Sequence, residues 1–69
     1  MISEEMYEEM MHMIGYGKLT ENFIDAVLVY DYDHELLLEL AEQCNERWGS
    51  SSVDIEKLKR AIERYNEEE

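Results

Sequence analysis

Apolar residues recur every three or four positions in four stretches of the chain, the spacing that places them on one face of an α-helix. These stretches are residues 3–14, 20–30, 34–48 and 53–66, and we predict a helix in each. The residues expected to face the core are Met6, Met10, Met13 and Ile14 in the first stretch, Phe23, Ile24, Val27 and Leu28 in the second, Leu37, Leu40, Ala41, Cys44 and Trp48 in the third, and Ile55, Leu58, Ala61, Ile62 and Tyr65 in the fourth.

Residues with a preference for helix ends lie at the borders of these stretches. Gly15 and Gly49 suit the left-handed conformation that follows a helix. Thr20 and Asp33 carry a side-chain oxygen that can cap a helix start. Segment 51–54 begins with serine and ends with aspartate, which is similar to a capping box. These signals support the four predicted helices.

The second stretch has an alternative interpretation. Residues 26–30 read Ala-Val-Leu-Val-Tyr, a composition that also favours a β-strand. A single strand has no partner to pair with, and no second candidate strand occurs in the sequence. We therefore predict a helix here too.

Short loops make successive helices antiparallel neighbours. We expect an all-α fold, a small single-domain bundle of about four short antiparallel helices formed by residues 1–69, with a frayed acidic end at 67–69. A chain of 69 residues has a small core, which usually supplies only about 3–5 kcal/mol of net stability. Self-association, as a homodimer for example, is therefore one way in which such a chain gains stability.

The charge is strongly negative and unevenly distributed. The formal net charge is −12, and residues 1–46 hold twelve acids but a single base, Lys18. Such a field repels nucleic-acid phosphates and anionic lipids and attracts basic protein surfaces. We therefore expect a basic protein surface as the partner, with no direct binding to nucleic acid or to a membrane.

Glutamates form a line along the third predicted helix. Glu35, Glu39, Glu42 and Glu46 fall within about 60° of one another and span roughly 16 Å of helix axis. Such a line could occupy a cleft that normally holds a phosphate backbone. The alternative is an ordinary solvated face, paired with basic residues of the fourth helix. The first predicted helix carries four further acids, Glu4, Glu5, Glu8 and Glu9. If the glutamate line is an ordinary solvated face, the basic residues that pair with it are Lys57, Arg60 and Arg64.

Several apolar residues lie outside the predicted core faces. Leu38 stands beside the glutamate line, where the helical pattern gives it no partner within the monomer. Tyr16, Val29 and Tyr32 raise the same question, and apolar residues rimmed by acids are typical of a binding patch. The methionines of residues 1–13 suit either an adaptable binding surface or a core filler, and their spacing favours the core.

Signals for chemistry are weak. Glu9-x-x-His12 and Asp31-x-x-His34 have the spacing of di-iron ligands, but neither pair is expected to point inward. Cys44 lies on an apolar stripe, as a small buried hydrophobe does. We assign no catalytic, cofactor-binding or metal-binding residue and expect no cofactor.

One set of acids resembles a known enzyme family. Glu39-x-x-Glu42 followed by Glu63-x-x-Asn66 is similar to the magnesium-binding acids of the all-α nucleotide pyrophosphatases of the MazG type. The resemblance covers four positions, and Asn66 stands where that family has an aspartate. It implies magnesium-dependent hydrolysis of nucleoside triphosphates.

These observations favour a small inhibitor or modulator that binds a protein. A nucleic-acid mimic of phage or mobile-element origin, which blocks a host nuclease or DNA-binding protein, fits the size and charge. The alternatives are a homo-oligomeric helical adaptor or regulatory subunit, and the pyrophosphatase-like enzyme. A single cysteine, a start without a basic leader and the absence of a long apolar run predict a cytoplasmic protein.

Overall fold

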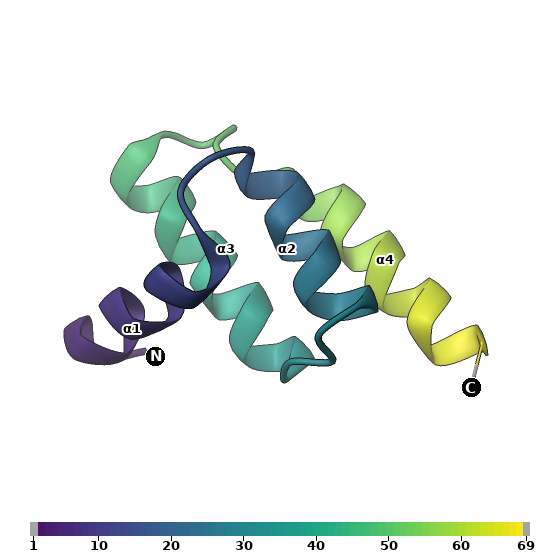
Figure 1. Cartoon of the computed structure of the whole chain (residues 1–69). Helices are drawn as coiled ribbons and strands as arrows, with labels where there is room; N and C mark the ends of the chain where they lie inside the picture. Colours follow the sequence, from purple (N-terminus) through teal and green to yellow (C-terminus); the bar gives the residue numbers. More distant parts are fainter. Residues whose placement is uncertain (1, 69) are drawn as a thin grey trace.

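The chain folds into four helices, as its apolar pattern predicts. The computed structural model describes residues 2–68, and of residue 68 only the backbone. The helices are α1 (Glu4–Ile14), α2 (Leu19–Leu28), α3 (His34–Trp48) and α4 (Ile55–Glu68), and no strand occurs in the described part (Figure 1). The prediction of an all-α bundle is therefore confirmed, and the second stretch is a helix. The last residue of the expected frayed end, residue 69, lies outside the described residues.

Side-chain caps begin three of the helices. The Asp33 carboxylate accepts hydrogen bonds from the backbone amides of Glu35 and Leu36 at 3.0 and 3.2 Å, as predicted. Ser3 caps α1 by accepting from the Met6 amide at 3.2 Å. Asp54 caps α4 by accepting from the Lys57 amide at 3.1 Å. Each cap satisfies backbone donors that have no partner within the helix.

Glycines follow the two helices for which they are predicted to do so. Gly15 after α1 has φ +97° and Gly49 after α3 has φ +128°. Residues other than glycine rarely adopt these φ values, so a Cβ at either position would strain the backbone. These two positions set the ends of α1 and α3.

Two of the predicted helix starts are wrong. Helix α2 begins at Leu19, after Lys18 in the left-handed conformation (φ 53°), so Thr20 lies inside the helix. The Thr20 hydroxyl instead accepts a hydrogen bond from the Asp54 amide at 3.1 Å, which ties α2 to the start of α4. Segment 51–54 forms no capping box, because Asp54 is itself the cap and α4 begins two residues later than Val53.

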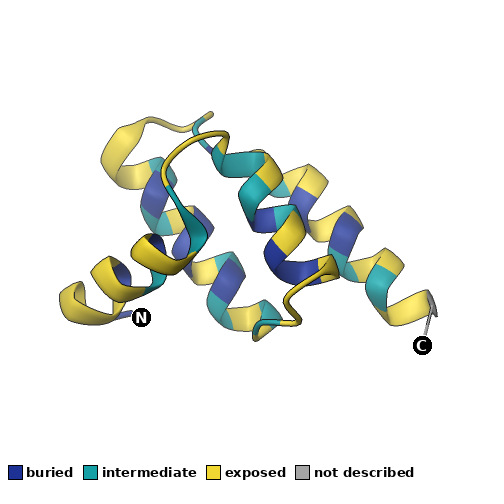
Figure 2. Ribbon diagram, in the orientation of Figure 1, coloured by how far each residue is buried: buried dark blue, intermediate teal, exposed yellow. Residues whose placement is uncertain are grey.

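The core lies where α2, α3 and α4 face one another. Helices α2 and α4 lie side by side, and α3 packs against both (Figure 1). Buried residues occur on all four helices and are coloured dark blue in Figure 2. They are Phe23, Ala26 and Val27 of α2, Leu37, Leu40, Ala41 and Cys44 of α3, Leu58 and Ala61 of α4, with Ile2, Tyr7, Met11 and Val53.

Helix α1 is turned relative to the predicted arrangement, so only part of its predicted face reaches the core, with Met10 and Ile14 half-buried against it. Tyr7 and Met11 are buried, whereas Met6 is 38% and Met13 66% exposed. Apolar residues cover two adjoining faces of α1, and α3 offers specific partners to only one of them. The Tyr7 hydroxyl accepts a hydrogen bond from Trp48 Nε1 at 3.1 Å. The buried Cys44 thiol donates to the Met11 sulfur at 3.4 Å.

Trp48 is the other departure from the predicted core. Its side chain is 65% exposed although the helical pattern places it on the inner stripe of α3. It stands at the last position of the helix, beyond the end of the packed interior, and its ring nitrogen reaches Tyr7. Leu28, the last residue of α2, is likewise 40% exposed. Apolar residues in final turns therefore extend past the core.

Candidate functional site

The four glutamates of α3 form an exposed line. Glu35, Glu39, Glu42 and Glu46 are all solvent-exposed. Among the described residues, Glu35, Glu42 and Glu46 make no ion pair with a lysine or an arginine. The residues proposed to neutralise them lie on α4, where Lys57 and Arg60 make no ion pair with them. Three carboxylates of this line are thus left to solvent or to a partner.

The acids of α1 are partly compensated within the chain. Glu4 and Arg47 form an ion pair at 2.6 Å, so one of the predicted partner-binding acids of α1 is already paired within the chain. The hydrogen bond from Arg47, helped by its charge, holds the pKa of Glu4 below its usual value. The Arg47 guanidinium also lies 4.0 Å from the centre of the Tyr7 ring. Of the other predicted site residues on α1, Glu5, Glu8 and Glu9 are exposed.

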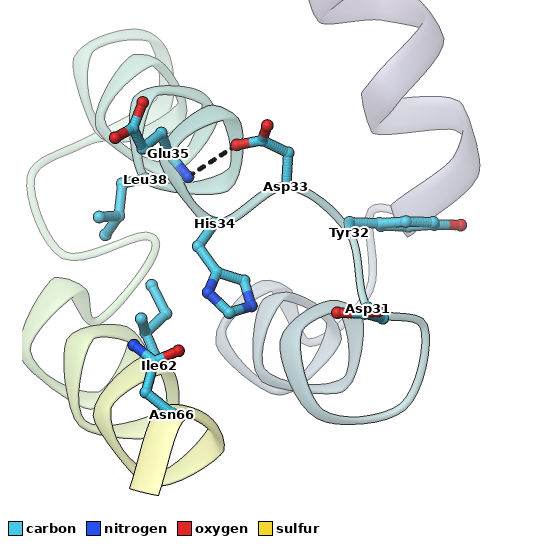
Figure 3. A pocket seen from close by; sticks show the side chains of 8 residues that line it. All are labelled: Asp31, Tyr32, Asp33, His34, Glu35, Leu38, Ile62 and Asn66. Carbon is cyan, nitrogen blue, oxygen red and sulfur yellow. Dashed lines mark hydrogen bonds between the residues drawn. The ribbon is translucent and has the colours of Figure 1, made fainter. Parts of the chain in front are cut away.

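A hollow at the start of α3 brings three predicted site residues together. Glu35, Leu38 and Tyr32 line a cavity of about 510 Å³, here called the Leu38 hollow (Figure 3). Helix α4 closes the opposite wall, towards which the Leu38 side chain points (Figure 3). The remaining lining residues are Asp31, Asp33, His34, Ile62 and Asn66.

Leu38 and Tyr32 are not isolated surface residues. Both are half-buried and pack against the hydrophobic core. The expectation that Leu38 gains nothing within the monomer is therefore wrong, because α4 approaches this side of α3 and supplies Ile62 as a neighbour in the hollow. Leu38 both stabilises the fold and presents part of its surface to the cavity.

Most polar groups of the Leu38 hollow already have partners. Asp31 accepts a hydrogen bond from the Tyr65 hydroxyl at 2.5 Å, and Asp33 caps α3. The His34 ring meets the Tyr65 ring edge-on, with 4.9 Å between centroids. The Glu35 carboxylate has neither a hydrogen bond nor an ion pair with any described residue. One acceptor beside an aliphatic wall suits a long basic side chain, whose methylenes pack on leucine while its charge meets the acid.

The other three glutamates of α3 share a second cavity. Glu39, Glu42 and Glu46, with Gln43 and Ile2, line a hollow of about 340 Å³. Ile2 itself is buried, so the floor of this hollow is apolar and its wall is acidic. Both cavities of α3 therefore combine carboxylates with aliphatic surface.

Tyr16 lies apart from the glutamates. It is 57% exposed and lines a different cavity, with Lys18, Leu19, Trp48 and Ser52. The loop that carries it is held by Asn22, whose side-chain amide donates to the carbonyl oxygens of Gly15 and Gly17. The structure thus does not bring Tyr16 together with the other predicted partner-binding residues.

A second kind of site is a groove lined by methionines, for which the sequence favoured a core role over a binding surface. Met6, Met10 and Met13 border a cavity of about 210 Å³ between α1 and the start of α3. The signal was present in the sequence, because the apolar residues of α1 are too many for one buried face. The prediction weighed an adaptable binding surface against a core filler for these methionines and favoured the core.

The structure also places the candidate metal ligands and the Cys44 thiol. Within the described residues, no three histidine, cysteine, aspartate or glutamate side chains come close enough together to hold a metal ion. Glu39 and Glu42 line one hollow and Asn66 lines another, so the positions of the pyrophosphatase resemblance lie apart. Burial raises the pKa of the Cys44 thiol, which keeps it in the unreactive neutral form.

Comparisons add no relative from which a function could be transferred. Within the described residues, none of the helices has the length and apolar character needed to cross a bilayer. No protein-family model, no curated protein and no solved structure shows a significant match to this chain.

Proposed function

We propose that this chain is a small protein-binding modulator that engages a basic protein surface through the acids of α3. The observation that carries the proposal is the exposed line from Glu35 to Glu46, of which Glu35, Glu42 and Glu46 have no ion pair with a described base. Like charges on one face cost stability. A partner rich in lysine and arginine would relieve that repulsion on binding.

The two hollows of α3 supply a way to hold basic side chains. In the Leu38 hollow, the stem of a lysine or arginine packs against Leu38 and Ile62 and its charge reaches Glu35. In the second hollow, a basic side chain lies over Ile2 and meets Glu42 and Glu46. Contacts of this kind add apolar burial to charge pairing, so they distinguish a specific partner from any basic surface.

The finer version of the proposal is nucleic-acid mimicry. The glutamate line spans roughly 16 Å along the axis of α3, and carboxylates on a helix can replace phosphates in a cleft lined by arginine and lysine. The partner is then a nuclease or a DNA-binding protein, and the chain competes with DNA. A phage or mobile element would gain from such a protein when it meets the nucleases of its host.

Binding to purified nucleases and DNA-binding proteins tests the proposal. We expect at least one basic protein to bind the chain at least about tenfold more tightly at about 50 mM than at about 500 mM salt. For a mimic, DNA and the chain must exclude each other from that protein. If no member of the panel shows salt-sensitive binding, the proposal fails.

A matched pair of variants locates the binding face. Changing Glu35, Glu42 and Glu46 together to glutamine removes three charges from α3, and changing Glu56, Glu63 and Glu67 removes three exposed charges from α4. We expect the α3 variant to lose at least about tenfold in affinity and the α4 variant to lose far less. Equal losses would indicate a response to net charge and not to this face.

A homo-oligomer has its own supporting observation. Val29 and Tyr30, after the end of α2, are 68% and 62% exposed, a large apolar exposure for so small a protein. Light scattering over a range of protein concentrations tests this alternative. A constant monomer mass at all concentrations would dismiss it.

A further inference from the structure

Helix α1 borders an apolar groove that the fold fills only in part, because Met10, Ile14, Tyr32 and Leu36 of its lining pack partly against the core. Its lining residues are Met6, Met10, Met13, Ile14, Tyr32, Asp33 and Leu36, here called the methionine groove. Met13 is 66% exposed and Met6 38%, while α1 is held to α3 by its other face, through Tyr7 and Met11. The groove therefore remains open although α1 is already docked.

The size and chemistry of the groove suit a side chain better than a cofactor. Its volume of about 210 Å³ is below the roughly 300–1,000 Å³ of sites for small molecules. Among the described residues, Asp33 is the lone charged residue in the lining, and its carboxylate caps α3. Methionine side chains are unbranched and polarisable, so they adapt to aliphatic and aromatic shapes alike.

The groove adjoins the proposed binding face. Tyr32 and Asp33 line both the methionine groove and the Leu38 hollow, so these two cavities share a wall. The Tyr32 ring points away from the Leu38 hollow towards α1 (Figure 3). On α3, Leu36 and Leu38 are adjacent in sequence to Glu35 and Glu39 and lie on either side of the glutamate line. One bound segment can therefore reach both cavities.

The charge around the groove defines what kind of segment fits. Glu9 is exposed, and at about 100° per residue it lies within about 60° of Met6 and Met13 on the surface of α1. Lys18 is the single base among residues 1–46. An apolar residue that enters the groove thus lies near the acids Asp33 and Glu9, and its neighbours in the partner gain by being basic.

We propose that the methionine groove receives one large apolar side chain from a basic amphipathic helix of the partner, whose lysine or arginine about one turn away occupies the Leu38 hollow. This inference rests on the proposed function and adds to it the chemistry of the recognised segment. The apolar residue supplies buried area and the basic residues supply orientation. Recognition then requires a helix with an apolar stripe and a basic face, and not positive charge alone.

Methyl signals of ¹³C-labelled methionine report on this groove directly. The probe is a synthetic peptide of about 18 residues, long enough to be helical, with leucines on one face and lysines elsewhere. The control peptide has the same composition with the leucines scattered. We expect the amphipathic peptide to shift the methyl signals of Met6, Met10 and Met13 and to leave that of the buried Met11 nearly unchanged. The scattered peptide should shift none of them at equal concentration.

Two variants with equal exposure separate the groove from general apolar surface. Met13 is 66% and Val29 68% exposed, and each is changed to glutamine. Met13→Gln should weaken binding of the amphipathic peptide by about tenfold, and Val29→Gln by less than about twofold. A Glu35→Gln variant should weaken both peptides, because it acts on charge.

The outcomes distinguish this inference from the proposed function. Salt-sensitive binding of both peptides without a methionine shift overturns the groove assignment and leaves the acidic face intact. Shifts that grow with protein concentration in the absence of peptide show that a second copy fills the groove, which also overturns the assignment. A shift of Met11 together with the others indicates a general rearrangement and counts against it equally. If neither peptide binds at low salt, both proposals lose support.

Discussion

The side-chain amide of Asn45 pairs with both backbone groups of Val53. Its Nδ2 donates to the Val53 carbonyl oxygen at 3.1 Å, and its Oδ1 accepts from the Val53 amide at 2.8 Å. Val53 is buried and lies before α4, in a segment without helical hydrogen bonds of its own. One α3 residue thus fixes the position at which the chain enters its last helix.

Asn45→Ala should destabilise the fold more than substitutions of partly exposed residues usually do. It leaves a donor and an acceptor of Val53 without partners next to the core, which costs about 1–3 kcal/mol. Urea denaturation followed by circular dichroism measures the loss. Asn66→Ala, at an exposed position of α4, is the control and should change stability by less than about 0.5 kcal/mol. Equal effects of the two variants would contradict the role given to Asn45.

Cys44 should react with alkylating reagents only when the protein unfolds. Its side chain is fully buried, and burial raises the pKa of the thiol above its usual value of 9.0. With about 3–5 kcal/mol of stability, labelling should be about 10²- to 5 × 10³-fold slower than in urea. Mass spectrometry of the iodoacetamide adduct over time gives the rate. Labelling of the folded protein at the unfolded rate would show that α1 does not stay docked over the thiol.

The ion pair between Glu4 and Arg47 should make stability depend on acid pH. The folded pKa of Glu4 lies below its usual value of 4.5, so the pair stabilises the fold above that value and is lost as the pH falls through the folded pKa. The destabilisation caused by Glu4→Gln should therefore shrink as the pH is lowered from 7 to about 3. Glu5→Gln, which removes an exposed glutamate with no ion pair to a described residue, corrects for the change in net charge. A constant difference between the two variants would mean that the pair is absent in solution.

The parts of the fold that the sequence predicts are those determined by residues close together along the chain. Asp33 and Gly49 act on the backbone within a few positions, and the bounds of α3 agree with the prediction. The buried residues Leu37, Leu40, Ala41 and Cys44 also agree, because one apolar stripe on α3 leaves no choice of face. Local chemistry and helical periodicity are sufficient for this helix.

The parts that the sequence does not predict depend on contacts between distant residues. Helix α1 has two apolar faces, and Trp48 and Cys44 select the one with Tyr7 and Met11. The ion pair that joins Glu4 to Arg47 spans 43 positions of the chain. No spacing rule reveals such pairings, so the methionine groove and the compensation of Glu4 emerge only from the folded arrangement.

The glutamates at the end of α3 should lower the stability of the fold and raise its affinity for the proposed partner. Glu42 and Glu46 are four residues apart on one face, and Glu46 lies in the last turn, where a negative charge meets the negative end of the helix dipole. Changing both to glutamine should raise the free energy of unfolding by about 0.5–1 kcal/mol at low salt. The gain should shrink at high salt because the repulsion is screened. Affinity for the proposed basic partner should fall at the same time.

The matched change on α4 should have the opposite effect on stability. Glu56 lies in the first turn of α4, four residues before Arg60, and Glu63 lies four residues after Lys59. Replacing both by glutamine removes favourable charge interactions, so the free energy of unfolding should fall by a few tenths of a kcal/mol. Denaturation curves and binding isotherms of the two double variants give the comparison. If the α3 variant alone gains stability and loses affinity, the acids of α3 form a surface that serves a partner. If stability and affinity change in the same direction in both variants, these acids are ordinary solvated charges.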